Sequence, residues 1–195
     1  MNIYIRSIII LGITFAFFGN CMATETKHWR DAEYYEFTYY SETIIDAPIE
    51  KVWPHALNTR GWLNDLHTET VAGEVGKVGH IERVTHPSKI DDDLSLRNYH
   101  YDKLIEVVPN KLFTLKVFSE KGGSYGGPEN MSFDTFILTE NNGKTKVSLV
   151  YNAEHPRDGK TDLEIQAGNE AAKKGFDKRF VNFWMKLKNL VEANN

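Results

Sequence analysis

Polar side chains in the middle of the chain could support acid/base chemistry. His80 and Glu82 are two residues apart, so they share one face if residues 78–86 form a strand. An imidazole beside a carboxylate can accept and donate protons, which is what general acid/base catalysis requires. His100 lies in a further strand-like segment, 96–107, that could adjoin the first. We assign no catalytic residue from the sequence, and we keep His80 and Glu82 as the candidates.

The same three side chains could also act as metal ligands, because zinc is commonly held by histidine and carboxylate groups. Side-chain alternation within each segment, however, does not show that the two strands lie next to each other. The remaining histidines fall in expected loops and helix ends without metal-type spacing: His28, His55, His67, His86 and His155. We therefore expect no metal and no cofactor.

Three other motifs give no support for a particular chemistry. Residues 122–127, Gly-Gly-Ser-Tyr-Gly-Gly, look like a phosphate-binding loop, but no helix is expected to follow and supply its N-terminus. Residues 91–93, Asp-Asp-Asp, lack the glycine and the terminal glutamate of an EF-hand calcium loop. No serine stands in a Gly-x-Ser-x-Gly elbow. We interpret the first motif as a hairpin connection that could act as a lid, and the second as a solvated acidic turn.

The first 23 residues differ from the rest of the chain in composition. A short start containing Arg6 precedes an apolar run over residues 7–19, and Ala23 supplies a small residue after it. This pattern is typical of a secretory signal peptide, so we expect cleavage after Ala23 and a periplasmic or secreted protein. One alternative is a membrane anchor, although the run is shorter than the roughly 20 residues that an anchor needs. The other is lipidation at Cys21, although Asn20 stands where a small residue is expected.

The composition limits the kinds of partner. Cleavage after Ala23 removes Arg6 and the only cysteine, so the mature chain is more acidic than the whole sequence, whose formal net charge is −4. Disulfide bonds and thiol catalysis are then excluded, and the excess of acidic residues argues against a nucleic-acid partner. A chain of 195 residues without repeats or a long linker is expected to form one domain. We expect an irregular lead-in over residues 24–35 and the domain over residues 36–195.

Residues 46–48, Asp-Ala-Pro, mark a sharp change of structure. Residues 36–45 have the β-branched and aromatic content of a strand. Pro48 suits the first turn of a helix, because proline has no N–H to leave unpaired there. Pro54 removes a hydrogen bond inside that helix, so we expect a kink and a second short helix over residues 59–66. Trp53 is expected to pack as a structural wedge.

The rest of the chain is expected to form an antiparallel meander followed by a long helix. Thr161 and Glu164 have the spacing of a capping box, and the apolar residues that follow recur at helical spacing. The other face of this helix is basic, and we interpret it as a solvated face that could contact an anionic membrane but does not require one. Residues 141–143, Asn-Asn-Gly, predict a tight turn between the last two of the strand-like segments, which are 68–74, 78–86, 96–107, 111–119, 131–140 and 144–153.

This order of elements resembles the START-like helix-grip superfamily, also called SRPBCC. The resemblance covers nearly all of residues 37–192 and depends on the order and spacing of several short motifs rather than on one of them. It implies an α+β helix-grip fold: a curved antiparallel sheet of about seven strands wrapped around a long C-terminal helix, with two short helices after the first strand. The motifs are Ala47-Pro48 with Glu50, Val52 and Trp53, then Trp62, Val75-Gly76-Lys77-Val78-Gly79, Glu106-Val107-Val108-Pro109, Phe136-Ile137-Leu138, Gly143-Lys144-Thr145 and Val147.

The resemblance also implies a cavity for an apolar ligand between the sheet and the terminal helix. Most side chains expected along it are large and apolar, and each of them could equally be plain core. Tyrosine hydroxyls and one carboxylate would supply the polar groups near the ligand or the cavity mouth. The expected ligand contacts are Trp62, Tyr99, Tyr101, Phe113, Leu115, Asp134, Phe136, Leu149, Tyr151, Phe176, Phe180 and Trp184.

The resulting hypothesis is an exported protein that carries or sequesters a hydrophobic small molecule, such as a lipid, a quinone or a polyketide-like aromatic. The alternative is an enzyme similar to polyketide cyclases or aromatases, with cyclase or dehydratase chemistry in the same cavity. A module similar to ATPase-activating co-chaperones is disfavoured by the signal peptide. A cavity wall with only tyrosine hydroxyls favours the carrier, whereas a buried His80 or Glu82 beside a second ionisable group favours the enzyme. The sequence leaves the ligand and the oligomeric state open.

Overall fold

The computed structural model describes residues 34–58, 67–85, 99–118 and 132–193. Residues Glu36–His155 and Gly159–Asn195 form one compact unit, to which the fold described below belongs. Tyr34, Tyr35 and Pro156–Asp158 fall outside this unit. The expected signal peptide over residues 1–23 and the lead-in up to residue 33 lie outside the described residues.

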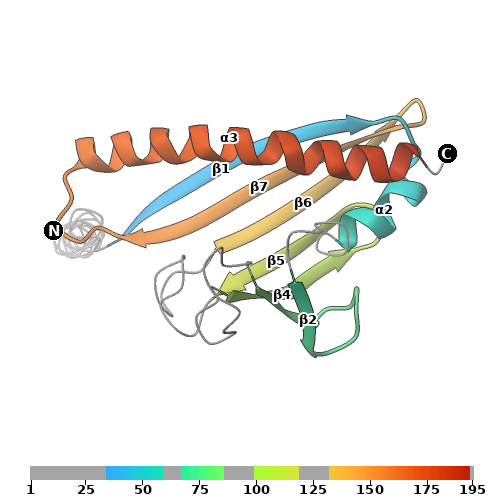
Figure 1. Cartoon of the computed structure of the whole chain (residues 1–195), viewed down its shortest axis with the longest axis horizontal. Coiled ribbons are helices and arrows are strands. Elements are labelled where there is room, and N and C mark those ends of the chain that lie inside the picture. Colours follow the sequence, from blue (N-terminus) through green and yellow to red (C-terminus); the bar gives the residue numbers. More distant parts are fainter. Residues whose placement is uncertain (1–33, 59–66, 86–98, 119–131, 194–195) are drawn as a thin grey trace, which may run out of the picture. The chain divides into compact units, whose positions relative to one another are not determined.

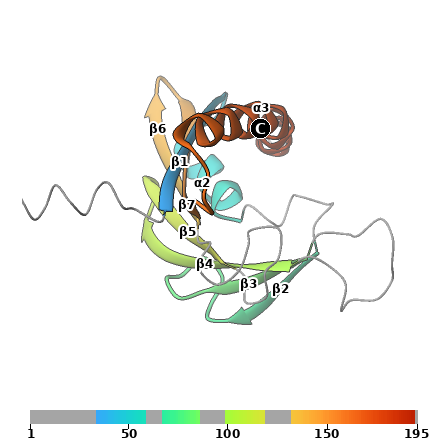
Figure 2. The ribbon, with the colours of Figure 1, turned by 90° about the vertical axis from the view of Figure 1, so that its left-hand side faces the viewer.

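The described strands form one seven-stranded sheet in the order β1-β7-β6-β5-β4-β3-β2. Each pairing from β2–β3 through β6–β7 is antiparallel, so consecutive strands lie side by side, as a meander requires. Figure 2 shows the sheet bending between its β1 and β2 edges. The strands are β1 (Tyr34–Ile45), β2 (His67–Ala72), β3 (Ile81–Thr85), β4 (Tyr99–Val108), β5 (Leu112–Phe118), β6 (Ser132–Asn141) and β7 (Lys144–Pro156).

The β6–β7 hairpin follows directly from its turn residues. Asn142 and Gly143 both adopt positive φ angles, 53° and 72°, which asparagine and glycine tolerate better than other residues. This turn pairs Asn141 with Lys144 and fixes the register of the whole hairpin. The same register places Phe136 opposite Leu149 on the buried face. The predicted turn and the alternation after it are confirmed.

Strand β4 contains a bulge that changes which residues face the core. Leu104 pairs with Leu115 of β5, but the next pair along is Glu106 with Thr114, so Ile105 is an extra residue. Thr114 donates a side-chain hydrogen bond of 3.2 Å to Glu106. Before the bulge the even-numbered residues of β4 face the core side, and after it Val107 packs against the core instead.

Helix α2 (Ile49–Leu57) begins directly after Pro48, as predicted, and runs on through Pro54. The proline therefore does not end the helix: it removes one internal hydrogen bond, and its own carbonyl accepts the N–H of Asn58 at the C-terminus. The second helix expected over residues 59–66 lies outside the described residues. Trp53 packs edge-on against Phe113, with ring centroids 5.8 Å apart, which matches the expected wedge.

The corner between β1 and α2 is held by hydrogen bonds from distant parts of the chain. The Thr145 hydroxyl donates to the Ala47 carbonyl at 2.7 Å, in a fully buried position. The Ile49 N–H, one of the donors that a helix start leaves without an internal partner, donates to the Glu140 carboxylate at 2.8 Å. These contacts give two backbone groups a partner where the chain leaves the strand abruptly at Pro48.

The long C-terminal helix α3 (Asp162–Glu192) begins at the predicted capping box. Thr161 accepts the backbone N–H of Glu164, and the Glu164 carboxylate accepts the backbone N–H of Thr161. Two partly buried hydrogen bonds attach α3 to β1: the Trp184 indole donates to the Ser41 hydroxyl at 2.7 Å, and the Tyr39 hydroxyl donates to Asp177 at 2.9 Å. No helix among the described residues is both long and apolar enough to span a membrane.

Helix α3 runs along the strands β1 and β7 (Figure 1). Aromatic rings from α3 and from the sheet pack against one another in the core. Phe176 lies 5.1 Å from Tyr39 and 5.0 Å from Tyr151, measured between ring centroids. Phe113 and Phe136 of neighbouring strands stack at 4.6 Å with nearly parallel planes. Such pairs stabilise the fold beyond the burial of their surface. The described aromatic side chains between α3 and the sheet therefore pack against one another as core. The apolar cavity expected in this region stays a prediction.

Candidate functional site

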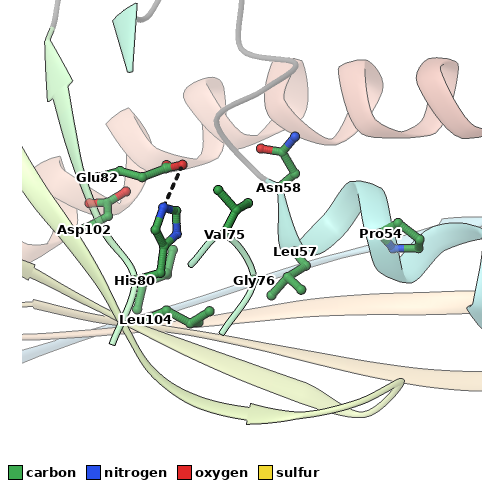
Figure 3. A pocket seen from close by; sticks show the side chains of 10 residues that line it. Pro54, Leu57, Asn58, Val75, Gly76, His80, Glu82, Asp102 and Leu104 are labelled. Carbon is green, nitrogen blue, oxygen red and sulfur yellow. Dashed lines mark ion pairs between the residues drawn. The ribbon is translucent and has the colours of Figure 1, made fainter. Parts of the chain in front are cut away.

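The described residues line an open cavity of about 220 Å³ at the C-terminal end of α2 (Figure 3). It lies among the C-terminal half of α2, the β2–β3 connection and the neighbouring strands β3, β4 and β5. α3 contributes none of the described lining residues. The lining consists of Pro54, Leu57, Asn58, Val75, Gly76, His80, Glu82, Asp102, Leu104 and Leu115.

The apolar wall of the cavity comes from three elements. Leu104 and Leu115 are paired across β4 and β5, and both are almost completely buried. Leu57 closes the wall from the last turn of α2, and Val75 extends it from the β2–β3 connection, where its side chain is 61% exposed. An apolar wall with one exposed member at the rim is the arrangement of a site open to a small apolar molecule.

The β2–β3 connection is shaped by glycines that keep it close to its neighbours. Gly76 has a φ of 77°, and a Cβ placed on it would lie 3.2 Å from a methyl carbon of Leu57. The Gly79 N–H donates to the Leu104 carbonyl at 2.8 Å, and the Leu104 N–H donates to the His80 carbonyl at 2.9 Å. These bonds extend the β3–β4 ladder back to His80 and fix its backbone beside the apolar wall.

The polar end of the cavity is formed by His80, Glu82 and Asp102 (Figure 3). His80 is buried, and its Nε2 lies 3.7 Å from a carboxylate oxygen of Glu82 and 3.2 Å from the Thr70 hydroxyl. Glu82 and Asp102 are register partners on β3 and β4, so both carboxylates project from the same face of the sheet. The candidates chosen from the sequence are thus brought together at one site.

Asp102 is the site residue that sequence reasoning missed. Its side chain is 2% exposed, and its carboxylate lies 3.2 Å from Nε2 of the equally buried His100. His100 pairs with Val84 on β3, so the two histidine-bearing strands, whose adjacency the sequence left open, are neighbours in the sheet. Asp102 alternates with His100 and Leu104 and shares their face, but this alternation points to the cavity only once the position of the β4 bulge is known.

Among the described residues, Leu115 is the one expected apolar ligand contact that lines this cavity. The others are held in the aromatic core under α3 or partly buried against it, and their contact with a ligand stays a prediction. This core group comprises Phe113, Phe136, Leu149, Tyr151, Phe176, Phe180 and Trp184.

Tyr99 and Tyr101 lie on the face of β4 opposite to Asp102 and Leu104. Tyr101 pairs with Phe118 of β5 and stacks on its ring at a centroid distance of 5.4 Å. The two tyrosines therefore do not line the described cavity. The expectation that they share a strand face is met, since their rings contact edge-to-face at 5.7 Å, but that face is the outer one.

Asp134 and Trp62 complete the expected set. Asp134 lies between Leu115 and Tyr151 in the register of the sheet, and its Oδ1 is shielded from solvent, so it has the inward orientation expected for it. It is not among the cavity-lining residues. Trp62 lies outside the described residues. Within the described ranges, no group of three or more histidine, cysteine or acidic side chains has the geometry to hold a metal ion.

Comparison with known proteins supports the fold but not a particular function. No protein-family model matches the chain, and no curated protein matches it significantly in sequence. Solved structures do match it. The protein of unknown function SA2116 from Staphylococcus aureus aligns with a TM-score of 0.65 at 13% identity, over 84% of this chain and 98% of that one.

Two further structures align over similar lengths. Ara h 8.0201 has a TM-score of 0.58 at 14% identity, over 82% of this chain and 99% of that one. CV1439 from Chromobacterium violaceum has a TM-score of 0.56 at 16% identity, over 80% and 96%. This chain has the helix-grip fold. The fold class implied by the resemblance is confirmed, and identities this low establish nothing finer.

Proposed function

We propose that this protein binds a hydrophobic small molecule in the cavity beside α2 and acts as an exported carrier of that molecule. The helix-grip fold commonly binds hydrophobic small molecules. The observation that carries the proposal is the concave apolar wall of Leu57, Leu104 and Leu115, which ends in a few polar groups. Ligand sites in general combine these two features.

The position of the cavity changes the expected ligand. A cavity running along α3 would suit a long lipid, but the aromatic rings there are in contact with one another. The cavity beside α2 has a volume of about 220 Å³, which is below the roughly 300–1,000 Å³ of drug-sized ligand sites. We therefore favour a compact apolar ligand over a long-chain lipid, a quinone with a tail or a large polyketide.

Export is part of the proposal because the composition of residues 1–23 is that of a signal peptide. The mass of the mature protein tests it. Cleavage after Ala23 gives a new N-terminus at Thr24, whereas lipidation would leave Cys21 as the modified first residue. A protein that keeps Met1 would contradict export by either route.

An enzyme remains the second candidate, and one observation favours it. His80 is buried, with Glu82 and Asp102 on the same cavity wall, which is the arrangement that the sequence argument assigned to catalysis. A histidine held next to a carboxylate could move a proton during a cyclisation or a dehydration. In this candidate, His80 and Glu82 keep the role that the sequence suggested for them.

Native mass spectrometry of the protein purified from its own compartment tests the proposal. A carrier releases an apolar small molecule that is unchanged after prolonged incubation with fresh protein. An enzyme converts the released molecule into a product of different mass, and the Glu82→Gln variant does so more slowly. A protein that is empty in every preparation, and that binds no added apolar compound, would overturn the proposed function.

A further inference from the structure

The C-terminal part of helix α3 is basic although the chain as a whole is acidic. Between Glu170 and Glu192 the helix contains five lysines and one arginine but a single carboxylate, whereas the whole chain has a formal net charge of −4. That carboxylate, Asp177, accepts a hydrogen bond from the Tyr39 hydroxyl of β1. The chain thus concentrates positive charge on one segment of one helix.

Two apolar side chains lie on the exposed side of this segment. Val181 is 58% exposed and Met185 is 50% exposed, and residues four positions apart in a helix are neighbours on one side of it. Figure 2 shows α3 with one side toward the sheet and the other side away from it. The side that packs on the sheet is formed by other residues, which are buried: Phe180, Trp184, Leu187 and Val191. Packing on the sheet therefore does not account for Val181 and Met185.

Lysines extend the row of Val181 and Met185 in both directions, because they stand three or seven residues away along the helix and so lie on the same side. All of them are exposed, and Lys188 also lies 3.7 Å from the Glu192 carboxylate one turn further on. The row is about 21 Å long at the rise of an α-helix. We call it the exposed stripe of α3, and it consists of Lys174, Lys178, Val181, Met185 and Lys188.

The shape and chemistry of the exposed stripe fit a flat anionic surface. Neither the cavity beside α2 nor the hollow among β1, β6 and β7 has a described lining residue on α3, so the stripe lies on a convex rod and not in either of these hollows. A helix that lies in a membrane interface has apolar side chains at the centre of its contact and cationic side chains around them. Lysine suits the edge of such a contact, because its hydrocarbon stem covers apolar surface while its ammonium reaches the polar headgroups.

We propose that the exposed stripe of α3 docks on an anionic lipid bilayer, with Val181 and Met185 at the boundary of the acyl chains and the lysines at the lipid phosphates. This inference goes beyond the proposed function, since it adds the surface at which a carrier takes up or releases its molecule. Each lysine near an anionic bilayer strengthens binding about fivefold. Burial of one half-exposed apolar side chain adds a factor of similar size.

Vesicle sedimentation tests this inference on the unmodified protein. The vesicles contain phosphatidylcholine alone or phosphatidylcholine mixed with phosphatidylglycerol, and both are used at low and at high salt. We expect the mixed vesicles to bind the protein at least about tenfold more tightly, and high salt to weaken that binding. Equal binding to both vesicles, or binding to neither, would overturn the inference. Calorimetry with phenylethanol, a compact apolar probe of the cavity beside α2, tests the proposed function separately and does not depend on this result.

A pair of charge variants locates the electrostatic contact. The double variant Lys174→Gln with Lys178→Gln should weaken binding to the mixed vesicles about 25-fold. Its control is Lys144→Gln with Lys146→Gln, which removes the same charge from β7, where these lysines pair with Asp46 and Glu42. The control should bind like the unmodified protein. Equal losses in the two double variants would mean that only net charge matters, and would overturn the inference.

A pair of apolar variants locates the hydrophobic contact. Met185→Ser should weaken binding to the mixed vesicles about fivefold. Leu163→Ser is the control, because Leu163 is 78% exposed on the same helix but stands between Asp162 and Glu164, outside the stripe. Equal effects of the two substitutions would overturn the inference. A dimer that forms without lipid and dissociates in Met185→Ser would also overturn it, because a second copy of the chain would then cover the stripe.

Discussion

Glu82 and Asp102 lie opposite each other on β3 and β4 and project their carboxylates from the same wall of one cavity. Antiparallel register makes this juxtaposition unavoidable once the two strands pair, because directly opposed side chains lie on one face. Two acidic groups placed side by side repel each other, and here each has a histidine within 4 Å. The pairing places both carboxyl groups at one end of the cavity.

Closing the rim of the cavity should abolish binding without harming the fold. Val75 lines the cavity and is 61% exposed, so Val75→Trp can place its ring over the opening. We expect the affinity for phenylethanol to fall at least about tenfold, while the free energy of unfolding changes by only about 0.5 kcal/mol. Titration calorimetry and urea unfolding measure the two quantities.

Val78→Trp is the control for that experiment, because Val78 belongs to the same connection, is 62% exposed and does not line the cavity. It should bind phenylethanol like the unmodified protein. Equal loss of binding in both variants would mean that the substitutions disturb the connection as a whole, and unchanged binding in both would place the ligand elsewhere.

The aromatic residues under α3 should behave as core. Phe136 is 3% exposed and stacks on Phe113, so Phe136→Ala should reduce the free energy of unfolding by about 3–5 kcal/mol. Phe133 lies on the same strand but is 37% exposed, and Phe133→Ala should cost less than about 1.5 kcal/mol. Urea unfolding distinguishes the two. Equal, small effects would indicate a loosely packed interior that could still admit a ligand.

The capping box should stabilise the start of α3. Thr161→Ala removes the oxygen that accepts the Glu164 N–H, and we expect a loss of about 1 kcal/mol in unfolding free energy. Thr161→Ser keeps the hydroxyl and should retain most of the stability. An alanine variant as stable as the serine variant would show that the start of α3 contributes little to the fold.

The same contacts should appear in the titration of Glu164. Hydrogen bonds from the Thr161 backbone, and then from its side chain, lower the pKa of the Glu164 carboxyl below its usual 4.5. A lowered pKa stabilises the fold above pH 4.5, and this contribution is lost as the pH falls through the lowered value. Carboxyl NMR titration should show the pKa of Glu164 moving back toward 4.5 in Thr161→Ala. A pKa unchanged by that substitution would argue against the hydroxyl contact.

Tyr39 should make the fold sensitive to alkaline pH. Burial, together with the hydrogen bond to Asp177, raises the pKa of the Tyr39 hydroxyl above its usual 10. A raised pKa gives a stabilisation that is complete below pH 10 and is lost as the pH rises through the raised value. Tyr39→Phe should therefore weaken the decline in stability above pH 10, whereas Tyr40→Phe, at an exposed position of β1, should not. Identical alkaline profiles for all three proteins would contradict this assignment.

Local signals predicted the elements well because each has a local cause. The positive φ angles at Asn142 and Gly143 and the reciprocal bonds of Thr161 and Glu164 depend on residues within a few positions of each other. The continuation of α2 through Pro54 was harder to anticipate. One missing hydrogen bond near the end of a helix is a small cost when Val52 and Ala56 are buried on either side of it.

The site was only partly predictable, and the bulge in β4 explains why. Val107 packs on the core. Strict alternation along β4, counted back from Val107, would therefore predict that Tyr101 and Tyr99 also face inward. The extra residue at Ile105 reverses that count, so Asp102 and not Tyr101 faces the cavity. A bulge depends on pairing between strands, and alternation within one strand carries no trace of it.

The location of the cavity could not be read from the sequence for a similar reason. Phe113, Phe136 and Phe176 have the same character whether they surround a ligand or one another. Only the ring distances in the folded protein show that Phe113 stacks on Phe136 and that Phe176 stacks on Phe37. The described cavity beside α2 lies where smaller side chains, Val75, Leu104 and Leu115, meet the end of that helix.

NMR titration of the isotope-labelled protein with phenylethanol tests the central claim most directly, because it reports where an apolar molecule binds. We predict saturable shifts of the backbone amides of Gly76, His80, Leu104 and Leu115, with little change at Phe176 and Trp184 of α3. Shifts concentrated along α3, or the absence of saturable shifts at any concentration, would contradict the claim that the cavity beside α2 is the binding site.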